Sequence, residues 1–462
     1  MENHKNEFTF SNHSITAFVW RGILVGVITG VVVSVFRLFI EILASFVVSY
    51  YHKAHENPWL LIPIACLSLV AVIVVGLLVK SDSDIKGSGI PHLEGELKGL
   101  VFPNWWSVLW KKFLGGTIAI SMGFMLGREG PSIQLGAMSA KGLAKYLNAS
   151  HLEKRVLIAS GAAAGLSAAF NAPIAGLLFV VEEIYHHFSR LVWITALVAS
   201  LVANFISLYI FGLRPILAMP KEIPFLGLHQ YWMLLILGVL LGALGYLYEL
   251  IVSLSEHPLP LMTIILFFVI RFIVSMFSYG SGLPGGIFLP ILTLGALAGS
   301  SFGLLFHQLG FLESKFIPLF LVLGMAGYFA AISKAPLTGM ILVTEMVGDL
   351  KPLMAIGVVA FVAYLIMDLL NGQPIYEAML EKMEIEHPTD LVEPTLIELP
   401  VSEKIAGQYV RDLKLPKNVL ITTQIHHKKS QVVSGNTMLQ SGATIFLVVN
   451  EADTGLVREV LM

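Results

Sequence analysis

The chain has 462 residues, 56% of them hydrophobic and only 13% charged, and its mean hydropathy is +0.79. Soluble proteins carry roughly a quarter charged residues, so this composition argues against a soluble fold. The net charge of −2 gives no reason to expect a nucleic-acid partner. The single cysteine, Cys66, lies in an apolar run, and we expect it simply to pack there.

Apolar runs of about twenty residues, the length that crosses a bilayer, recur along the chain. The pattern predicts a polytopic α-helical membrane protein. The first twenty residues are polar and mixed, without the apolar core of a signal peptide, so we expect the first apolar segment to direct insertion. The clearest runs are Gly22–Ile40, Leu60–Val79, Leu191–Phe211, Tyr231–Val252, Leu261–Phe277 and Pro352–Leu369.

Several segments after residue 80 are interrupted by glycine, proline and polar residues. Such breaks are tolerated at membrane depth only where they face protein or a water-filled cavity. We therefore expect these segments to line an internal site rather than lipid. They fall at 87–91, 127–131, 171–173, 282–290 and 334–336.

The interruptions recur in the same order in two halves of the chain. Pro173 aligns with Pro336 and Pro131 with Pro290, at offsets of 163 and 159 residues. We infer a duplicated membrane unit, roughly 20–190 and 225–370. Matched broken helices in two halves are a sequence pointer to a transporter's binding site. The two offsets also pair Gly127 with Gly286, Gly136 with Gly295, Gly161 with Gly324, Ala172 with Ala335, Gly176 with Gly339 and Glu182 with Glu345.

The segment 127–131, Gly-Arg-Glu-Gly-Pro, places a carboxylate at a break between two apolar helices. A helix that starts there leaves amide groups unpaired, and such amides bind anions. We predict that the Glu129 carboxylate occupies the place of an anion and then releases it, because an acid inside a membrane segment is a functional candidate. The alternative is an ion pair between Glu129 and Arg128. Arg128 otherwise supplies positive potential or faces water.

The segment 87–91, Gly-Ser-Gly-Ile-Pro, is built in the same way, with the Ser88 hydroxyl between two glycines. A hydroxyl and backbone amides are neutral donors that suit a weakly hydrated halide, which must bind and leave again. The alternative is an ordinary glycine turn at the membrane surface. The segment Gly286-Ile287-Phe288 occupies the repeat position of 127–129 and would add further amides.

Glu182 and Glu183 follow the helix that Pro173 opens. Glu182 has the repeat counterpart Glu345, so we interpret it as structural. Glu183 faces Met346 in the alignment, which favours a task found once per subunit, such as proton entry from the cytoplasmic side. The alternative is two solvated acids at a helix end. His186 and His187 beside them are interpreted as interfacial residues.

Beyond Leu370 the composition changes. We predict a charged exit helix carrying Glu381, Lys382, Glu384 and Glu386, a linker over 381–397, and a small α/β module over 398–462. Its core is modest, which favours pairing with a second copy. Within the module we predict strands at Val419–Ile425 and Thr444–Val449 and a closing helix at Thr454–Leu461.

Taken in order, the segments GSGIP at 87–91, GREGP at 127–131 and GGIFLP at 285–290, with Tyr376, resemble the CLC family of chloride channels and proton-coupled chloride transporters over about residues 20–380. The resemblance implies a homodimer of inverted-repeat subunits, each with its own pore, in a domain of about 21–380 that follows an N-terminal arm of 1–20.

The resemblance also implies roles for particular residues. The anion site would be lined by Ser88, Gly130, Ile287, Phe288 and Tyr376, although a tyrosine at 376 is also a common interfacial anchor. Glu129 would be the outer gate and Glu183 the inner proton-transfer acid, which the family's channels generally lack. Ser88 resembles the chloride-preferring form, whereas proline there would suggest nitrate. Supporting positions are Gly87, Gly89, Lys112, Arg128 and Glu182.

The tail resembles the C-terminal domain of RCK potassium-transport regulators rather than the nucleotide-binding CBS domains of larger relatives. Residues 409–416 and 435–442 carry this likeness. It implies a dimerising cytosolic module and a regulatory nucleotide, such as cyclic di-AMP or an adenine nucleotide. The candidate ligand contacts are Ile421, His426 and Val433. The basic segment 426–429 is equally well explained as a solvated hairpin tip.

Together these features predict a chloride/proton antiporter in a bacterial plasma (inner) membrane, with no catalytic, metal or cofactor site of its own. A passive voltage- or pH-gated chloride channel is the alternative, and a fluoride exporter ranks lower. A membrane enzyme is a third class, based on the formal serine-hydrolase match at 299–303. That motif needs a preceding strand, whereas a membrane helix is expected there.

Overall fold

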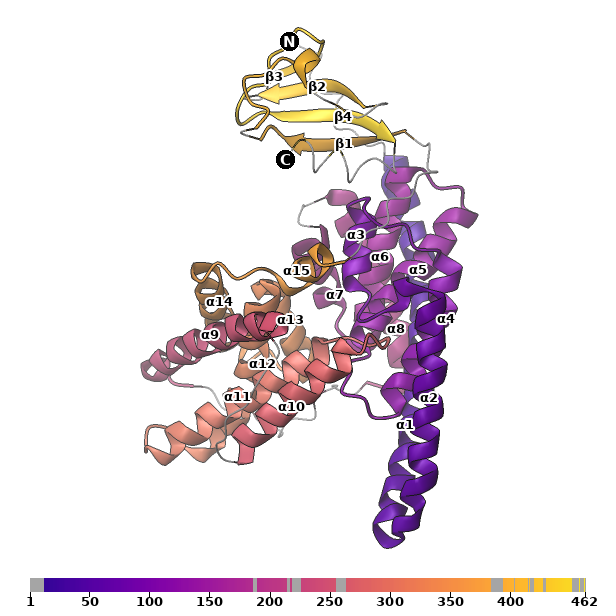
Figure 1. The fold of residues 1–462 in the computed structure, drawn as a ribbon. Helices are drawn as coiled ribbons and strands as arrows, with labels where there is room; N and C mark the ends of the chain where they lie inside the picture. The colour runs from indigo at the N-terminus through magenta and orange to yellow at the C-terminus, as the bar shows by residue number, and fades with distance from the viewer. Residues whose placement is uncertain are drawn as a thin grey trace. The chain divides into compact units, whose positions relative to one another are not determined.

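The computed structural model describes the chain except residues 1–11, 186–188, 214–216, 218–225, 255–262, 384–393, 403, 414, 416–418, 427–428, 451–456, 458–460 and 462. It divides into two compact units. The first comprises Met1–Leu93 with Asn104–Glu381, and the second Glu94–Pro103 with Lys382–Met462. The first is helical and the second contains the β-sheet (Figure 1).

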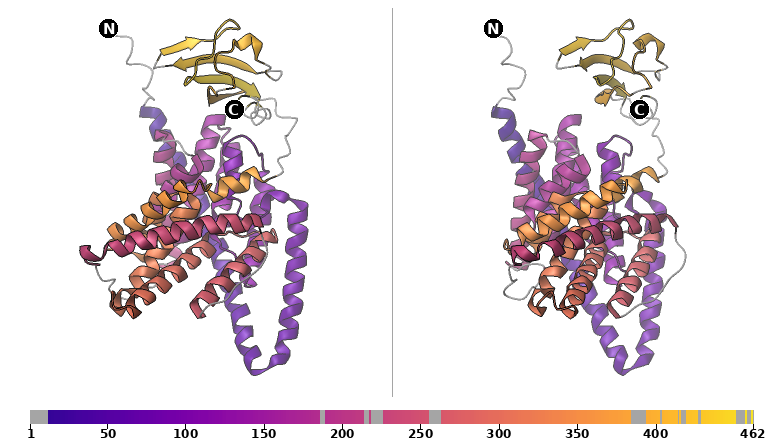
Figure 2. Two further views of the ribbon diagram at one scale, coloured as in Figure 1. Left: turned by 60° about the vertical axis from the view of Figure 1, so that its left-hand side comes forward. Right: turned by 90° about the vertical axis from the view of Figure 1, so that its left-hand side faces the viewer.

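The first half of the helical unit starts with two long helices that form a hairpin and spread apart away from their connection (Figures 1 and 2). The first of them has 45 residues and extends beyond the predicted apolar run at both ends, and Arg37 and Glu41 pair with each other inside it (Nε–Oε1 2.8 Å). The helices are α1 (Asn12–Glu56), α2 (Leu61–Ser81), α3 (Ile90–Leu97), α4 (Trp105–Ser121), α5 (Glu129–Tyr146), α6 (His151–Phe170), α7 (Pro173–Phe179) and α8 (Arg190–Phe211).

The second half repeats this pattern of helices broken by glycine and proline turns. A π-helical segment, Val180–Tyr185, continues α7 in the first half. The second-half helices are α9 (Trp232–Leu254), α10 (Thr263–Gly280), α11 (Phe288–Gln308), α12 (Ile317–Ser333), α13 (Pro336–Val347), α14 (Leu353–Leu369) and α15 (Ile375–Glu381).

The two halves are held by the same glycine crossings. A Cβ at Gly136 on α5 would lie 2.2 Å from the carbonyl oxygen of Gly161 on α6. A Cβ at Gly295 on α11 would lie 2.4 Å from the carbonyl oxygen of Gly324 on α12. Backbones can approach this closely only where both residues lack side chains. These are the glycines that the sequence repeat pairs, so the duplication is visible as a common backbone geometry.

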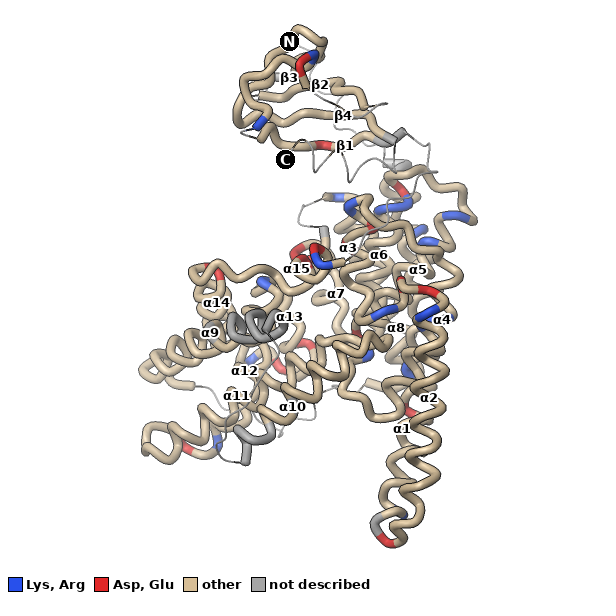
Figure 3. The backbone as a smooth tube through the Cα atoms, in the orientation of Figure 1, with Lys and Arg blue, Asp and Glu red and all other residues tan. Residues whose placement is uncertain are grey.

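Five helical segments in the described part of the chain are long and apolar enough to cross a membrane. One of them contains α2, which carries no charged residue before Lys80 (Figure 3). Cys66 lies on α2, in the predicted apolar run, and is exposed on the surface of the unit. Its exposure follows from the position of α2, whose side chains are mostly on the outside of the unit.

The second unit contains a four-stranded antiparallel sheet with the order β1-β4-β2-β3. Its strands are β1 (Pro394–Pro400), β2 (Leu420–His426), β3 (Lys429–Val432) and β4 (Thr444–Asn450). Strands β2 and β4 confirm the predicted segments within one residue at either end, whereas β1 and β3 were not predicted. Strand β1 is at the sheet edge, where its terminal prolines are tolerated.

Two predicted helices of the tail are only partly testable. The predicted exit helix corresponds to α15. Because α15 ends at Glu381, the charged helix expected over 381–386 does not start at that residue. Glu384 and Glu386 lie outside the described residues. Most of the closing helix expected at Thr454–Leu461 lies outside them too, although Val457 and Leu461 are helical and pack in the core of the sheet unit.

The serine-hydrolase match at 299–303 lies within helix α11. Ser301 donates its hydroxyl back to the Leu297 carbonyl at 2.8 Å, as helical serines commonly do. A nucleophile elbow requires a sharp turn between a strand and a helix. The segment therefore has the sequence of that motif without its geometry.

Candidate functional site

Three of the predicted glycine segments meet in the helical unit. The amide of Gly127 donates to the Gly286 carbonyl at 2.7 Å, and the amide of Gly286 returns a bond to the Gly127 carbonyl at 2.8 Å. The amide of Gly285 donates to the Gly87 carbonyl at 3.0 Å. The segments 87–91, 127–131 and 285–290 are thus joined by backbone hydrogen bonds, although the bonded residues lie up to 198 positions apart in sequence.

Ser88 is fully buried between two glycines in the left-handed region, Gly87 at φ +61° and Gly89 at φ +81°. Glycine is the residue that adopts this conformation without strain. Ser88 Oγ accepts the amide of Ile90 at 3.3 Å. A Cβ at Gly130 would lie 2.7 Å from the Ser88 Cβ, so this glycine lets the two segments touch.

Lys112 is fully buried on α4, and its ammonium group fixes the segment before Ser88. Its Nζ donates to the carbonyls of Ile85 at 2.9 Å and Gly87 at 2.7 Å. Gln134 on α5 donates from Nε2 to the Asp84 carbonyl at 2.8 Å. A Cβ at Gly89 would lie 2.1 Å from Gln134 Oε1, so only glycine fits beside this amide.

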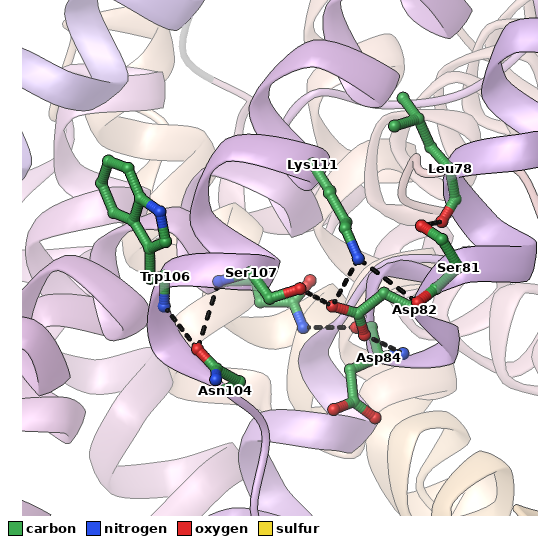
Figure 4. Close-up of polar contacts among 9 residues, drawn as sticks. Leu78, Ser81, Asp82, Asp84, Asn104, Trp106, Ser107 and Lys111 are labelled. Carbon is green, nitrogen blue, oxygen red and sulfur yellow. Dashed lines mark hydrogen bonds and ion pairs between the residues drawn. The ribbon is translucent and has the colours of Figure 1, made fainter.

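A polar network around Asp82 holds the residues that precede Asp84 (Figure 4). The Asp82 carboxylate accepts a short hydrogen bond from the Ser107 hydroxyl and lies 3.5 Å from the Lys111 ammonium. It also accepts the amide of Asp84 at 3.2 Å. Hydrogen bonds to side chains and to backbone carbonyls therefore fix the segment that leads to Ser88. They give the Ser88 hydroxyl a defined position.

Glu129 is the first residue of α5 and is buried, with 1% of its surface exposed. The backbone amides of Glu129 itself and of Leu289 hydrogen-bond to its carboxylate. Its Oε2 atom has no partner among the described residues. Arg128 instead pairs with Glu41 on α1, Nη1 to Oε1 at 3.3 Å. The carboxylate therefore lies among backbone amide groups at the starts of two helices, α5 and α11.

Ile287 and Phe288 are buried at the start of α11, the repeat position of Arg128 and Glu129. The Phe288 ring packs against Phe329 and Phe170, with centroids 4.7 Å and 5.2 Å away. The second half thus places an aromatic ring where the first half places an acid.

Tyr376 is buried on α15. Three residues later on the same helix, Met379 Sδ accepts a hydrogen bond from the hydroxyl of Tyr279 at 3.3 Å. Positions i and i+3 share a helix face. The Tyr279 hydroxyl oxygen would lie 3.0 Å from a Cβ at Gly87, the residue before Ser88. The short helix of Tyr376 is in this way connected to the Ser88 segment.

Glu182 and Glu345 each cap the start of a helix in the opposite half of the unit. Glu182 accepts the amides of Leu337 at 3.2 Å and Thr338 at 2.7 Å, and the Thr338 hydroxyl at 2.7 Å, at the start of α13. Glu345 accepts the amides of Ile174 at 3.1 Å and Ala175 at 2.8 Å, at the start of α7.

Glu183 is adjacent to Glu182 but differs in environment. It is buried, with 4% of its surface exposed, in the π-helical segment that continues α7. Such segments are rare in proteins, and those that occur are often found at functional sites. The interpretation of Glu183 as a solvated acid is therefore wrong. His186 and His187 lie outside the described residues.

The residues suggested for a regulatory ligand lie in the sheet unit. Ile421 is buried in its core and Val433 packs partly against that core, so both have structural contacts. His426 ends β2 and pairs with Lys429 in the hairpin register. The hairpin-tip residues 427–428 lie outside the described part of the chain.

Sequence reasoning missed three polar residues of the site, namely Gln134, Tyr279 and Thr338. Gln134 was detectable as an amide side chain in an otherwise small and apolar stretch. Thr338 follows Pro336, which the repeat marks. Tyr279 stands at the end of an apolar run, where a tyrosine usually suggests a membrane-interface anchor.

The family model described as voltage gated chloride channel matches residues 70–257 and 243–368, and the TrkA-C domain model matches 395–462. The H(+)/Cl(-) exchange transporter ClcA of Vibrio cholerae serotype O1 (strain M66-2) is 30% identical over 436 residues, covering 82% of this chain and 92% of that protein. ClcA of Vibrio parahaemolyticus serotype O3:K6 is 30% identical over 433 residues, with the same coverage.

The fold is similar to that of solved structures. A slow cyanobacterial Cl−/H+ antiporter aligns with a TM-score of 0.71 and 29% identity, over 79% of this chain and 97% of that one. A CLC-type fluoride/proton antiporter aligns with a TM-score of 0.62 at 21% identity, over 78% of this chain and 97% of that one, which shows a common fold alone. The chain belongs to the voltage-gated chloride channel (CLC) family and carries a TrkA-C domain at its C-terminus.

Proposed function

We propose that the protein exchanges chloride for protons across a bacterial inner membrane. The observation that carries this proposal is the position of Glu129. Its carboxylate is buried at the start of α5 and takes backbone amides of Glu129 and Leu289. Amides at helix starts favour any negative charge, whether a carboxylate or a free anion. Protonation removes the charge of Glu129, so proton uptake and anion entry are linked.

The anion itself would be held by neutral donors. Ser88 supplies a hydroxyl, and the helix starts at Gly130 and at Ile287 and Phe288 supply amides and positive dipole potential. Tyr376 supplies a second hydroxyl from α15. Neutral donors bind a halide without the strong attraction of a fixed cation, so the ion can leave. The Ser88 segment favours chloride as the transported anion.

Glu183 is the proposed inner proton-transfer acid. Its neighbour Glu182 is engaged in capping α13, so the two acids have separate tasks. The repeat counterpart of Glu183 is Met346, which cannot carry a proton. Relatives named as H(+)/Cl(-) exchange transporters support an exchanger rather than a passive channel.

The test is proton flux in liposomes that contain the purified protein. An outward chloride gradient should drive protons inward against their own gradient. Glu183→Gln should abolish proton movement and leave chloride flux, because the amide cannot transfer a proton. Glu129→Ala should let chloride flow without coupling to protons, because no side chain competes for the amides.

The matched control is Glu313→Gln, which changes an acid that is exposed and paired with Lys315. It should retain coupled flux. Chloride flux without uphill proton movement in the unmodified protein would contradict the exchanger and leave the gated channel, with Glu129 as gate alone.

A homodimer is proposed for the assembly. Helices α7 and α13 have 7 and 12 residues, too short to span a bilayer, and they pack against each other. Ile174 and Leu337 are exposed directly beside the two glutamate caps. Polar breaks at membrane depth need protein cover rather than lipid. A second copy over this face provides it, and cross-linking of cysteines placed at Ile174 or Leu337 would detect it.

The tail is proposed as a cytosolic regulatory domain that binds a nucleotide, either cyclic di-AMP or an adenine nucleotide. Support comes from the TrkA-C match at 395–462, which begins beside β1 and slightly before the predicted boundary at 398. The membrane domain would cover about 21–380. A rise in melting temperature of the full-length protein with either nucleotide is expected, and no shift with both would leave dimerisation as the tail's role.

A further inference from the structure

Two arginines share one carboxylate beside Glu129. Arg37, within the apolar run of α1, donates from Nε to Glu41 Oε1 at 2.8 Å, one helical turn further along α1. Arg128, the N-cap residue of α5, donates from Nη1 to the same oxygen at 3.3 Å. Arg128 directly precedes Glu129, so this cluster lies at the start of α5. Two cations and one anion leave an excess of one positive charge there.

The Arg37 guanidinium is also held by an aromatic ring. Its Cζ atom lies 3.9 Å from the ring centroid of Phe211, the last residue of α8, and its side chain is 13% exposed. The Nη1 atom is buried and has no hydrogen-bond partner in the described part of the chain. A guanidinium that stacks on a ring keeps its edges for anions. A charged residue inside a membrane segment is a functional candidate.

The Glu41 Oε1 atom occupies a position that suits an anion. Both arginine nitrogens donate to this one oxygen, so they are no farther apart than the sum of the two distances. Chloride accepts N–H donors at slightly longer distances than oxygen does, so an ion at this position reaches both nitrogens. The Glu41 side chain is 47% exposed. It can turn into water at little cost, because exposed ion pairs contribute little to stability.

We propose that Arg37 and Arg128 form an entry subsite for chloride and other small monovalent anions, and that the Glu41 carboxylate fills this subsite until an anion displaces it. The excess positive charge attracts anions and speeds their arrival. The next position on the path is that of the Glu129 carboxylate. The inference rests on the proposed function in taking Glu129 as this next position, but it requires no movement of protons.

The first test is chloride uptake by liposomes that contain the full-length protein, measured against the external chloride concentration. Arg37→Gln should raise the concentration that gives half-maximal uptake by about tenfold at low ionic strength, the lower end of electrostatic steering effects. Potassium gluconate should reduce this shift, because salt screens exposed charges. Arg37→Lys should recover most of the loss, because it keeps the charge. Neither of these two responses is expected if Arg37 only stabilises the fold.

The matched control is Lys53→Gln, which removes one positive charge from an exposed position of the same helix. It should keep the half-saturating chloride concentration of the unmodified protein. An unchanged half-saturating concentration in Arg37→Gln at low ionic strength would overturn the proposal, even if the melting temperature of this variant fell. An equal shift in Lys53→Gln would also overturn it, because the effect would then come from overall charge.

Glu41→Ala tests the competing carboxylate. Without it, chloride meets two free arginines, so the half-saturating concentration should fall by about threefold, and by less in Glu41→Gln, whose amide oxygen still accepts from the arginines. Glu41→Gln also replaces Glu41→Ala if the alanine variant does not fold. The fall should disappear when Arg37→Gln is added, because the two side chains act at one site. A rise or no change in both Glu41 variants would contradict the displacement.

A direct test locates the ion. Crystals of the full-length Glu41→Ala protein grown with sodium bromide should show an anomalous scattering peak between the guanidinium groups of Arg37 and Arg128. The peak should be missing when Arg37→Gln is added. Absence of a peak in Glu41→Ala would overturn the proposal. A peak without any shift in half-saturating chloride would show an adventitious ion only and would overturn it as well.

The entry subsite and the exchanger fail differently. If the unmodified protein moves protons uphill but the Arg37 and Glu41 variants keep its half-saturating chloride concentration, the subsite fails and the exchanger stands. If it moves no protons uphill but chloride uptake shifts in these variants as described, the exchanger fails and the subsite serves a gated channel.

Discussion

The two halves of the membrane unit have the same backbone features and different chemical groups. Asn171 and Lys334 end α6 and α12 in the left-handed region, at φ +54° and +55°. Ala172 and Ala335 follow with φ −128°, ψ 77° and φ −118°, ψ 75°. Such agreement between residues 163 positions apart shows how closely the duplicated geometry is kept.

The side chains diverge where chemistry is proposed. Glu129 in the first half faces Phe288 in the second, and Glu183 faces Met346. The shared acids, Glu182 and Glu345, are both engaged in capping. The comparison teaches that paired positions maintain the architecture and unpaired positions carry the proposed exchange. The predictions below test this division, from the largest expected effect to the smallest.

The largest effect is expected at the glycine crossings. Gly136→Val and Gly295→Val would each place atoms inside a backbone carbonyl, at 2.2 Å and 2.4 Å for Cβ alone. We expect a loss above about 3 kcal/mol in either half, beyond ordinary overpacking. The measurement is the yield of monodisperse protein by size-exclusion chromatography. Gly76→Ala, where a Cβ meets no atom within 4 Å, should behave normally. Tolerance in one half only would break the equivalence.

The glutamate caps come next. Glu182→Ala and Glu345→Ala should each lower stability by about 2–4 kcal/mol, because amide donors lose charged acceptors. Glu182→Ala should cost more, since its carboxylate also accepts the Thr338 hydroxyl. The apparent melting temperature of purified protein reports the order. The reverse order would show that the extra hydroxyl bond does not contribute.

Thr338→Val sharpens that difference. Removing the hydroxyl that donates to Glu182 at 2.7 Å should cost about 1 kcal/mol. In this background, Glu182→Ala and Glu345→Ala should cost the same, because each carboxylate then caps two amides. Melting temperatures of the four variants form the comparison. If the two glutamate substitutions still lowered stability by different amounts in this background, the Thr338 hydroxyl would not be the cause of the difference.

The smallest effect is expected at Arg128, whose repeat partner is the uncharged Ile287. Its pair with Glu41 spans 3.3 Å, and the Glu41 side chain is 47% exposed. Exposed pairs contribute about 0–1 kcal/mol, so Arg128→Gln should shift the melting temperature only slightly. Glu41→Gln should give a similar shift. A large effect of Arg128→Gln alone would indicate a role beyond this pair.

The sequence predicted features that glycine and proline enforce locally. Glycine and proline mark particular backbone conformations. They therefore predicted the breaks at 127–131 and 334–336 and the glycine pairs at the helix crossings. Strand β1 was missed because Pro394 and Pro400 resemble linker residues, and the length of α1 because both of its ends lie outside the apolar run Gly22–Ile40.

The contacts within the site were harder to predict, because they join residues far apart in sequence. Glu182 was interpreted as structural, but its partner Thr338 lies 156 residues away and no local pattern connects them. Tyr279 and Met379 are 100 residues apart and gain meaning only beside Ser88. The roles of the individual site residues remain predictions for the flux and binding experiments.

The double hydrogen bond between Gly127 and Gly286 has a consequence for how the protein can move. These two glycines are repeat equivalents bonded to each other, so the internal twofold axis passes between them, immediately beside Glu129. Moving one half away from the other would break these two hydrogen bonds beside the proposed anion site. Access from the two sides of the membrane is therefore expected to alternate by local side-chain rotation about a stationary centre.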